Sequence, residues 1–358
     1  MATEAFVHQG SPQRVVFGAG ALTRVGEEAR RLGIRRTLVL STPGHRDAAE
    51  RVAGLLGDAA AGVFARATMH TPVAVTEAAL ARVRDMGVDG AIAIGGGSTI
   101  GLSKAIAIRT DLPQIAIPTT YAGSEATDIL GETDDGQKTT RRDPRVLPET
   151  VIYDVDLTLT LPAAITAASG MNAIAHAVEG LYARNAGPLL RLMAEDGIRA
   201  LAAALPRIAR APKESDARSD ALYGAWLCGA VLGSAEMGLH HKLCHVLGGS
   251  FGLPHAETHT AILPHAVAYN AAAAPEAMAR VARALGAPEA AGGLHGLGQM
   301  IGAPTALRDI GMPKDGLDRA ADVAVANPYN NPRPLDRGAI RALLDDAWHG
   351  RRPMEGTS

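Results

Sequence analysis

The stretch Gly90-Ala-Ile-Ala-Ile-Gly-Gly-Gly-Ser-Thr-Ile100 decides the fold of the first half of the chain. Its run of alanine and isoleucine indicates a buried strand, its three glycines a tight turn, and Ser98 the N-cap of a following helix. Similar strand-and-helix units repeat from residue 14 to residue 153, which is typical of a parallel sheet with crossover helices. We expect strands at 14–17, 37–40, 62–65, 90–94, 114–117 and 150–153. We expect helices at 21–32, 46–56, 75–86 and 98–108.

The second half of the chain has a different pattern, because β-branched runs thin out after Pro162 and alanine, leucine and charged residues dominate. Helix-length segments lie at 161–184, 189–205, 215–235 and 275–285. The sequence therefore predicts two domains: an α/β domain over residues 1–157 with a Rossmann-like parallel sheet, and an all-α domain over residues 158–358. We expect the active site in the cleft between them.

Composition excludes several classes of partner. The chain has 358 residues, of which 20% are charged, with a formal net charge of -2 and a pI near 6.6. This balance offers no positive field for nucleic acid or an anionic membrane, and no apolar run is long enough to span a bilayer. The amino terminus does not resemble a signal peptide, and two cysteines in a chain of this size suit a reducing compartment. We therefore expect a cytoplasmic protein.

Two loops at the ends of neighbouring expected strands are suited to a dinucleotide. Consecutive glycines let the backbone approach a ligand closely, and the free amides and dipole of the helix that follows attract a phosphate. A tight turn without any ligand is the alternative for this glycine loop alone. A second, hydroxyl-rich loop at 118–125 follows the next strand, and two such loops at adjacent strand ends favour a ligand crevice. The expected coenzyme contacts are Gly95, Gly96, Gly97, Ser98, Thr119, Thr120 and Ser124.

The loop after the second expected strand reads Ser41-Thr-Pro-Gly-His45, and we expect Ser41, Thr42 and Pro43 to contact the coenzyme as well. It carries no acidic side chain that would bind a ribose 2′-hydroxyl and repel a 2′-phosphate. We therefore expect weak discrimination between NADH and NADPH, with Arg46 as a candidate phosphate partner.

Half of the twelve histidines lie between Gly238 and His265. His241 and His245 are four residues apart, which on a helix places both rings on one face, and Asn172 and His176 form a second pair of this spacing. Imidazole is suited both to metal ligation and to proton transfer near neutral pH. The cluster is therefore a candidate catalytic or metal-binding site.

Several motifs together resemble the iron-containing (group III) alcohol dehydrogenase superfamily, and within it the maleylacetate reductases. The resemblance covers essentially the whole chain and implies a dehydroquinate synthase-like fold, a reduced nicotinamide coenzyme and a homodimer. The motifs that carry it are Gly95–Ser98, Pro118-Thr-Thr, Thr158-Leu-Thr-Leu-Pro162, Gly170-Met-Asn-Ala-Ile-Ala-His-Ala-Val-Glu179, Gly238-Leu-His-His-Lys-Leu-Cys-His-Val-Leu-Gly-Gly249 and Leu253-Pro-His-Ala-Glu-Thr-His259.

The chain departs from the metal-dependent relatives at one position. The resemblance implies that those relatives hold a divalent ion with an aspartate and three histidines, and the matching residues here are Asn172, His176, His241 and His255. A neutral amide at 172 removes the only anionic ligand and its strong Coulomb attraction for a dication. We expect no bound metal, the alternative being that Asn172 still serves as a fourth ligand.

The resemblance implies reduction of the 2-ene of maleylacetate to 3-oxoadipate in aromatic catabolism. A metal-dependent alcohol or polyol dehydrogenase, a non-redox relative such as dehydroquinate synthase, and an inactive nucleotide-binding protein are the alternatives. We expect His245 to donate the proton or stabilise the enolate, and His176, His241 and His255 to bind oxygens of a dicarboxylate substrate. The other expected substrate contacts are Asn172, His240, Lys242 and Tyr329. We expect Lys138 to contact the coenzyme or the substrate, the alternative being a solvated surface lysine.

Overall fold

The computed structural model describes residues 6–134, 136–327 and 329–355, and of Lys138 it describes the backbone alone. Its strands are β1 (Arg14–Gly18), β2 (Thr37–Leu40), β3 (Ala60–Phe64), β4 (Gly90–Gly95), β5 (Gln114–Pro118), β6 (Ile129–Asp134), β7 (Gln137–Arg142) and β8 (Thr150–Asp154). The helices of the first half are α1 (Val25–Arg31), α2 (Arg46–Leu56), α3 (Val73–Asp85) and α4 (Gly97–Thr110). Those of the second half are α5 (Ala163–Tyr182), α6 (Pro188–Arg210), α7 (Ser215–Ser234), α8 (Leu239–Phe251), α9 (His255–Asn270), α10 (Pro275–Leu285), α11 (Ala290–Met300), α12 (Leu317–Ala326) and α13 (Arg337–His349).

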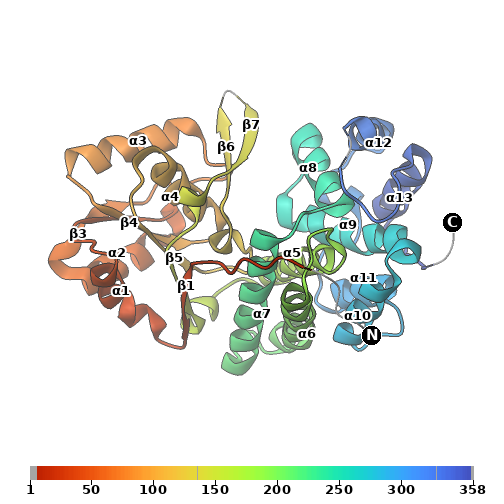
Figure 1. The fold of residues 1–358 in the computed structure, drawn as a ribbon, viewed down its shortest axis with the longest axis horizontal. Coiled ribbons are helices and arrows are strands. Elements are labelled where there is room, and N and C mark those ends of the chain that lie inside the picture. Colours follow the sequence, from red (N-terminus) through yellow and green to blue (C-terminus); the bar gives the residue numbers. More distant parts are fainter. Residues whose placement is uncertain (1–5, 135, 328, 356–358) are drawn as a thin grey trace. The chain divides into compact units, whose positions relative to one another are not determined.

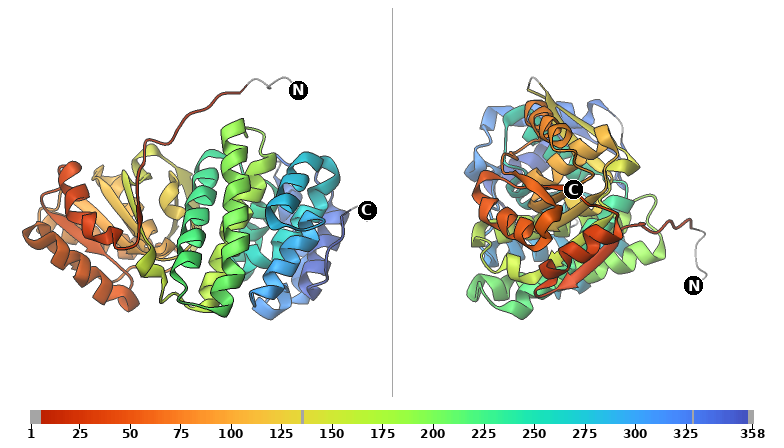
Figure 2. Two further views of the ribbon diagram at one scale, coloured as in Figure 1. Left: turned by 90° about the horizontal axis from the view of Figure 1, so that it is seen from below. Right: turned by 90° about the vertical axis from the view of Figure 1, so that its left-hand side faces the viewer.

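The chain forms two compact units, of which one is residues 10–161 and the other contains residues 6–9 and the chain from Pro162 onward. The first unit is built on a six-stranded parallel sheet of order β1-β8-β5-β4-β2-β3 (Figure 1). The second unit has helices packed side by side (Figure 2), and its described residues contain no strand. The predicted combination of an α/β part and an all-α part is confirmed.

Side chains of β4 alternate between two cores, one on each face of the sheet. Ile92 and Ile94 pack with residues of α1 and α2, whereas Ala91 and Ala93 pack with residues of α3 and α4. This period of two is what a strand buried on both faces requires. The expected strands and helices of this half therefore all occur, with boundaries that differ by a few residues at most.

The strand order creates a point where the chain changes direction across the sheet. From β2 the chain crosses to β3 on one side, and from β4 it crosses to β5 on the other, while β2 and β4 are neighbours. Ligands of doubly wound sheets bind outside the carboxyl ends of the strands at such a point. The loops that follow β2 at Leu40 and β4 at Gly95 both lie there.

A two-stranded antiparallel hairpin of β6 and β7 (Figure 1) was not expected from the sequence. Gly136, at φ 78°, lies in its turn. β7 reads Gln-Lys-Thr-Thr-Arg-Arg and carries no apolar alternation by which a strand is recognised. Ion pairs hold it instead, since Glu132 on β6 pairs with Arg141 on β7 and with Arg109 on α4.

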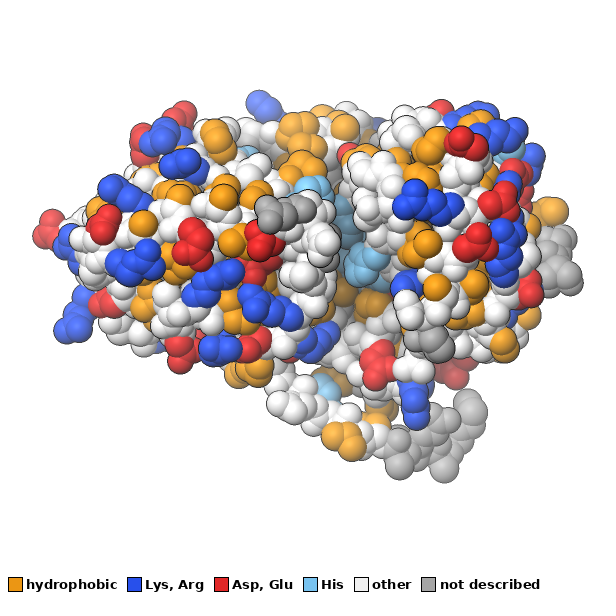
Figure 3. All heavy atoms as spheres, turned by 90° about the horizontal axis from the view of Figure 1, so that it is seen from above, with side chains coloured by type: hydrophobic (Ala, Val, Ile, Leu, Met, Phe, Trp, Pro, Cys, Tyr) orange, Lys and Arg blue, Asp and Glu red, His pale blue; other side chains and the backbone are white. Residues whose placement is uncertain are grey.

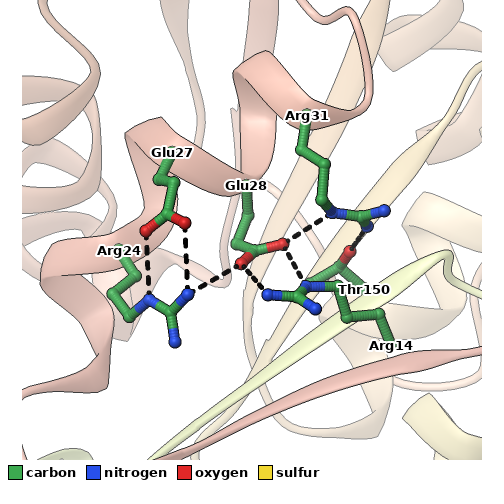
Figure 4. A network of polar contacts seen from close by, with 6 residues as sticks. All are labelled: Arg14, Arg24, Glu27, Glu28, Arg31 and Thr150. Atoms are coloured by element: carbon green, nitrogen blue, oxygen red, sulfur yellow. Dashed lines mark hydrogen bonds and ion pairs between the residues drawn. The ribbon is translucent and has the colours of Figure 1, made fainter.

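A buried carboxylate ties the edge of the sheet to its first helix. Glu28 on α1 is fully buried and pairs with Arg14 on β1 and Arg31 on α1, each at 2.9 Å (Figure 4). Arg31 also donates to the hydroxyl of Thr150 on β8 at 2.6 Å. These hydrogen bonds lower the pKa of Glu28 although its burial acts in the opposite direction, so the group is held as an anion. The network joins β1, α1 and β8.

Helix α5 is the centre of the helical unit and is buried along nearly its whole length. Two glycines allow its neighbours to approach closely: a Cβ at Gly170 would lie 2.7 Å from Leu205 of α6, and one at Gly180 would lie 2.1 Å from Val231 of α7. This packing fixes α5, which carries Asn172 and His176, as a rigid support. Among the described residues no helix combines the length and the apolar character needed to cross a membrane.

Candidate active site

Six histidines from three helices form one cluster in the helical unit. His176 comes from α5, His240, His241 and His245 from α8, and the last two from the first turns of α9. Neighbouring ring centroids lie between 4.3 and 6.5 Å apart around the cluster. The members are His176, His240, His241, His245, His255 and His259.

The cluster has a buried part and an exposed part. His176, His240, His241 and His259 are buried, with at most 6% of their surface exposed. His245 and His255 are exposed, and their rings are stacked with centroids 6.5 Å apart. Histidine side chains are visible on the face of the molecule drawn in Figure 3. A ligand would therefore meet the exposed pair before the buried rings.

Burial makes most of the inner rings neutral. It lowers the pKa of His240 to about 3 and the pKa values of His176 and His259 well below the usual value, and neighbouring imidazoles act in the same direction. Charging any of these rings requires an anion close to it. In the free protein they are hydrogen-bonding groups and potential ligands without charge.

Several polar atoms of the cluster are buried and have no hydrogen-bond partner among the described residues. They are Asn172 Oδ1, His176 Nδ1, His241 Nε2 and His259 Nε2. Such atoms are costly to leave without a partner, and in native proteins they mark places where a ligand, ion or water binds. The inner face of the cluster is therefore built to receive polar groups.

The ligand atoms of His176, His241 and His259 all lie within 4.8 Å of one another, a spacing compatible with a metal ion. Zinc accepts three neutral imidazoles, so these donors fit a zinc ion. The anionic ligand that the resemblance assigns to iron-dependent relatives is replaced by Asn172, whose amide supplies no charge. His255, and not His259, was assigned from the sequence to the set of residues that match the ligands of metal-dependent relatives, and that assignment stays a prediction. The expected absence of metal stays a prediction.

Two members of the site were missed by the sequence analysis. His259 lies four residues after His255, and on a helix this spacing places two rings next to each other. That spacing was the sequence signal that could have identified His259. Glu179, three residues after His176, accepts a hydrogen bond from Nδ1 of His241 at 2.6 Å. Conversely, His265 belongs to the dense stretch of histidines but is outside the cluster, because ten residues of α9 separate it from His255 by about 15 Å.

The expected substrate residues Lys242 and Tyr329 lie next to each other. The ammonium of Lys242 is 5.8 Å from the centre of the Tyr329 ring. Burial and the charge of Glu179 raise the pKa of Tyr329, and its hydroxyl is buried without a partner among the described residues. His240 is further inside, where its Nε2 lies 3.0 Å from Nδ1 of His259.

The expected coenzyme loops of the α/β unit also contain unpaired hydroxyls. The side-chain oxygens of Ser41, Thr99 and Thr119 are buried and have no partner among the described residues. They follow β2, β4 and β5 at the carboxyl ends of these strands. Hydroxyl groups in this place can donate hydrogen bonds to the phosphate and ribose oxygens of a nucleotide, so the loops fit such a group.

The glycine loop is shaped for close approach. Gly95 has φ +149°, and a Cβ there would lie 2.5 Å from the hydroxyl of Thr99. A Cβ at Gly96 would lie 3.1 Å from the side chain of Thr120, so the two expected coenzyme loops touch. No side chain caps the N-terminus of α4, because Gly96 is its N-cap and Ser98 is the second residue of the helix. The expected capping by Ser98 is therefore wrong. Free amides at that end favour an anion.

The remaining expected coenzyme contacts lie in the loops after β2 and β5 and in β7. The hydroxyl of Thr42 is hydrogen-bonded to Nδ1 of His45 at 3.0 Å, and Pro43 begins a short 3-10 helix. The carbonyl of Ser124 accepts a hydrogen bond of 2.6 Å from the fully buried Lys104. Lys138 is in β7, and its side chain lies outside the described residues.

Comparisons with known proteins agree with this arrangement. Residues 12–155 match the family model of the iron-containing alcohol dehydrogenases, and residues 166–348 match the model of that family's C-terminal part. The chain is 59% identical to a maleylacetate reductase of Burkholderia cepacia over 98% of this chain and 99% of that protein. The crystal structure of maleylacetate reductase from Agrobacterium tumefaciens is 54% identical, covers 98% of this chain and all of that one, and gives a TM-score of 0.95.

A crystal structure described as a putative alcohol dehydrogenase from Ralstonia eutropha is 59% identical, with a TM-score of 0.97 over 98% of this chain. The chain belongs to the iron-containing alcohol dehydrogenase family, and it is an oxidoreductase. Within that family its full-length similarity is to the maleylacetate reductases. The expected family is confirmed.

Proposed function

We propose that this chain is a maleylacetate reductase, which reduces the carbon–carbon double bond of maleylacetate to give 3-oxoadipate in bacterial catabolism of aromatic compounds. One observation carries the proposal beyond the family: full-length identity of 59% to a maleylacetate reductase accompanies Asn172, a neutral residue, beside the buried histidines. A site without its own inner anion at this position suits a substrate that brings two carboxylates.

We propose NADH or NADPH as the coenzyme. The residues that would hold it are those with unpaired hydroxyls or open backbone, above all Ser41, Gly96, Ser98 and Thr119. Residues 1–157 would serve as the dinucleotide-binding domain and residues 158–358 as the domain that binds the substrate. The remaining proposed contacts are Thr42, Pro43, Gly95, Gly97, Thr120, Ser124 and Lys138.

The reaction needs one hydride and one proton. A bound reduced nicotinamide supplies the hydride, which adds to the alkene carbon β to the ketone. The electron pair of the double bond moves toward the ketone, giving an enolate whose oxygen carries the charge, and protonation of the carbon next to the ketone completes the product. The task of this chain's residues is to bind two carboxylates, stabilise the enolate oxygen and deliver the proton.

We propose His245 as the proton donor, because it is exposed at the outer edge of the cluster, where substrate and solvent can reach it. His176, His241 and His255 would bind the carboxylate and carbonyl oxygens, with Asn172, His240, Lys242 and Tyr329 as further contacts. A dianion near neutral imidazoles raises their pKa. Substrate binding would thereby create the positive charge that stabilises the enolate.

A metal-dependent alcohol or polyol dehydrogenase is the second candidate, favoured by the three ligand atoms of His176, His241 and His259 within 4.8 Å. The two functions differ in substrate as well as in metal. Purified protein incubated with maleylacetate and NADH, with absorbance of NADH followed, should consume one NADH per maleylacetate and yield 3-oxoadipate. Activity only toward alcohols, or none toward maleylacetate, would reject the first proposal.

We further propose a cytoplasmic location and a homodimer. Both rest on the likeness to relatives and, for location, on the cysteine content. No site for nucleic acid or a membrane is proposed, since the chain's formal net charge is -2 and its partner is a small dicarboxylate.

A further inference from the structure

Glu179 is a fully buried carboxylate beside the histidine cluster that the reaction scheme above does not use. It lies on α5, three residues after His176. Its two oxygens accept hydrogen bonds from the backbone N–H groups of Gly238 at 3.0 Å, His240 at 3.0 Å and His241 at 3.3 Å. They also accept from Nδ1 of His241 at 2.6 Å. One side chain thus receives four donors from a single short segment.

These contacts satisfy the start of α8. The first amides of a helix have no partner within the helix, and here Glu179 takes three of them while Oδ1 of Asn331 takes the N–H of Leu239 at 3.3 Å. A negative charge at a helix N-terminus is also favoured by the helix dipole. Because α8 carries His241 and His245, the contact fixes how these rings face α5.

The same carboxylate determines where the proton of His241 sits. Oε2 of Glu179 accepts the backbone N–H groups of Gly238 and His241, and it lies 2.6 Å from Nδ1 of His241. A carboxylate oxygen that already accepts two N–H groups acts as an acceptor toward the ring as well, so Nδ1 of His241 carries the hydrogen. The other nitrogen, Nε2, is buried, has no partner among the described residues, and belongs to the group formed with His176 and His259.

We propose that Glu179 is a positioning residue, whose carboxylate fixes the start of α8 and holds His241 in the Nδ1–H form with Nε2 turned toward the ligand. The assignment of that ligand as substrate rests on the proposed function. The tautomer itself does not depend on which substrate is used. A carboxylate that orients a metal-ligating imidazole in this way contributes about 10- to 100-fold to affinity or activity, and we expect an effect of that size for His241.

The first test needs no substrate. In protein labelled with 15N-histidine, long-range 1H–15N correlations identify which ring nitrogen bears the proton, and the signals lost in His241→Asn belong to His241. The expected result for the unaltered chain is a single Nδ1–H form. An Nε2–H form would overturn the proposal, whatever reaction the protein catalyses.

The second test uses Glu179→Gln, whose amide has one acceptor oxygen in place of two, so its NH2 must face at least one donor. We expect a mixture of His241 tautomers and a kcat for maleylacetate reduction lower by about 10- to 100-fold, with the Kd for NADH unchanged. Glu236→Gln is the matched control, because Glu236 is exposed and bonded to Asn330 outside the cluster. It should retain full kcat.

A double-mutant comparison separates positioning from general support of the fold. If Glu179 acts through His241, adding Glu179→Gln to His241→Asn should lower kcat by less than about threefold further, because coupled residues give non-additive effects. A full additional 10-fold loss, or a pure Nδ1–H form in Glu179→Gln, would overturn the proposal. Absence of maleylacetate reduction by the unaltered chain would reject the proposed function and leave the tautomer result standing.

Discussion

Asn172→Asp restores the carboxylate of the metal-dependent relatives and is the most informative single substitution in the site. Asn172 is 2% exposed, and its Oδ1 has no partner among the described residues. A substrate carboxylate received by the neighbouring imidazoles would lie about one ring spacing away, and the rings of His176 and His241 are 5.2 Å apart. At that distance and an effective dielectric constant of about 20, two negative charges repel by about 3 kcal/mol.

This repulsion corresponds to about a 100-fold rise in KM for maleylacetate, since about 1.4 kcal/mol is a factor of ten. The assay is steady-state oxidation of NADH at about pH 8, with protein freed of metal by a chelator, because burial raises the pKa of an aspartate and a protonated one would not repel. Asn172→Ala controls for loss of the amide without a new charge. Its KM should rise less than tenfold.

The same variant should gain affinity for dications, because the new carboxylate completes a three-histidine, one-aspartate donor set. Added zinc at about 1,000 times its Kd would stabilise the fold by about 4 kcal/mol, visible as a rise in Tm. A KM for Asn172→Asp within threefold of that of the unaltered chain would show that a charge at position 172 does not face the substrate.

Three further results are expected. His245→Gln should lower kcat by about 10²- to 10⁴-fold if this ring delivers the proton, whereas His255→Gln should mainly raise KM; equal kcat values for the two variants in steady-state assays would contradict these roles. Burial lowers the pKa of Lys104 to about 7 in the folded protein, whereas the unfolded chain has a value of about 10.4. The stability that comes from the neutral, buried Lys104 is therefore complete above about pH 10.4, and it is lost as pH falls through about 7. In chemical unfolding, the free energy of unfolding should therefore rise with pH between about 7 and 10.4, by up to about 1.4 kcal/mol per pH unit. The Lys104→Met variant should lack this part of the slope. An identical slope in both proteins would show that Lys104 does not titrate in this range. Arg46→Ala should raise KM for NADPH more than KM for NADH, and an equal change for both coenzymes would exclude Arg46 as the phosphate partner.

The α/β half could be predicted from sequence because the central strands β2, β4, β5 and β8 are runs of fully buried residues, and because α2 buries one apolar face. Residues 37–40 and 46–56 matched in full, since strong periodicity ends sharply at Ser41 and Gly57. The β6–β7 hairpin could not be found, because Glu132 and the arginines that pair with it are polar residues whose partners are distant in sequence. Such pairing becomes visible only when the chain is folded.

Only those parts of the site that follow from spacing within one helix could be predicted from the sequence. Helical spacing brought His241 and His245 to one helix and placed Asn172 one turn before His176. It did not reveal that His259 lies with His176 and His241 in the buried group, because that depends on how α9 packs against α5 and α8. Glu179 was hidden within a recognised motif, and its role depends on the start of α8, about 60 residues away.

In the proposed reaction, imidazoles bind the substrate and stabilise the enolate without a metal. The most direct measurement is single-turnover oxidation of NADH by maleylacetate, made on chelator-treated protein whose iron and zinc contents have been determined by elemental analysis. We expect an undiminished rate with less than about one metal ion per ten chains. A rate that falls sharply after chelation and returns when iron or zinc is added would show that the reaction needs a metal.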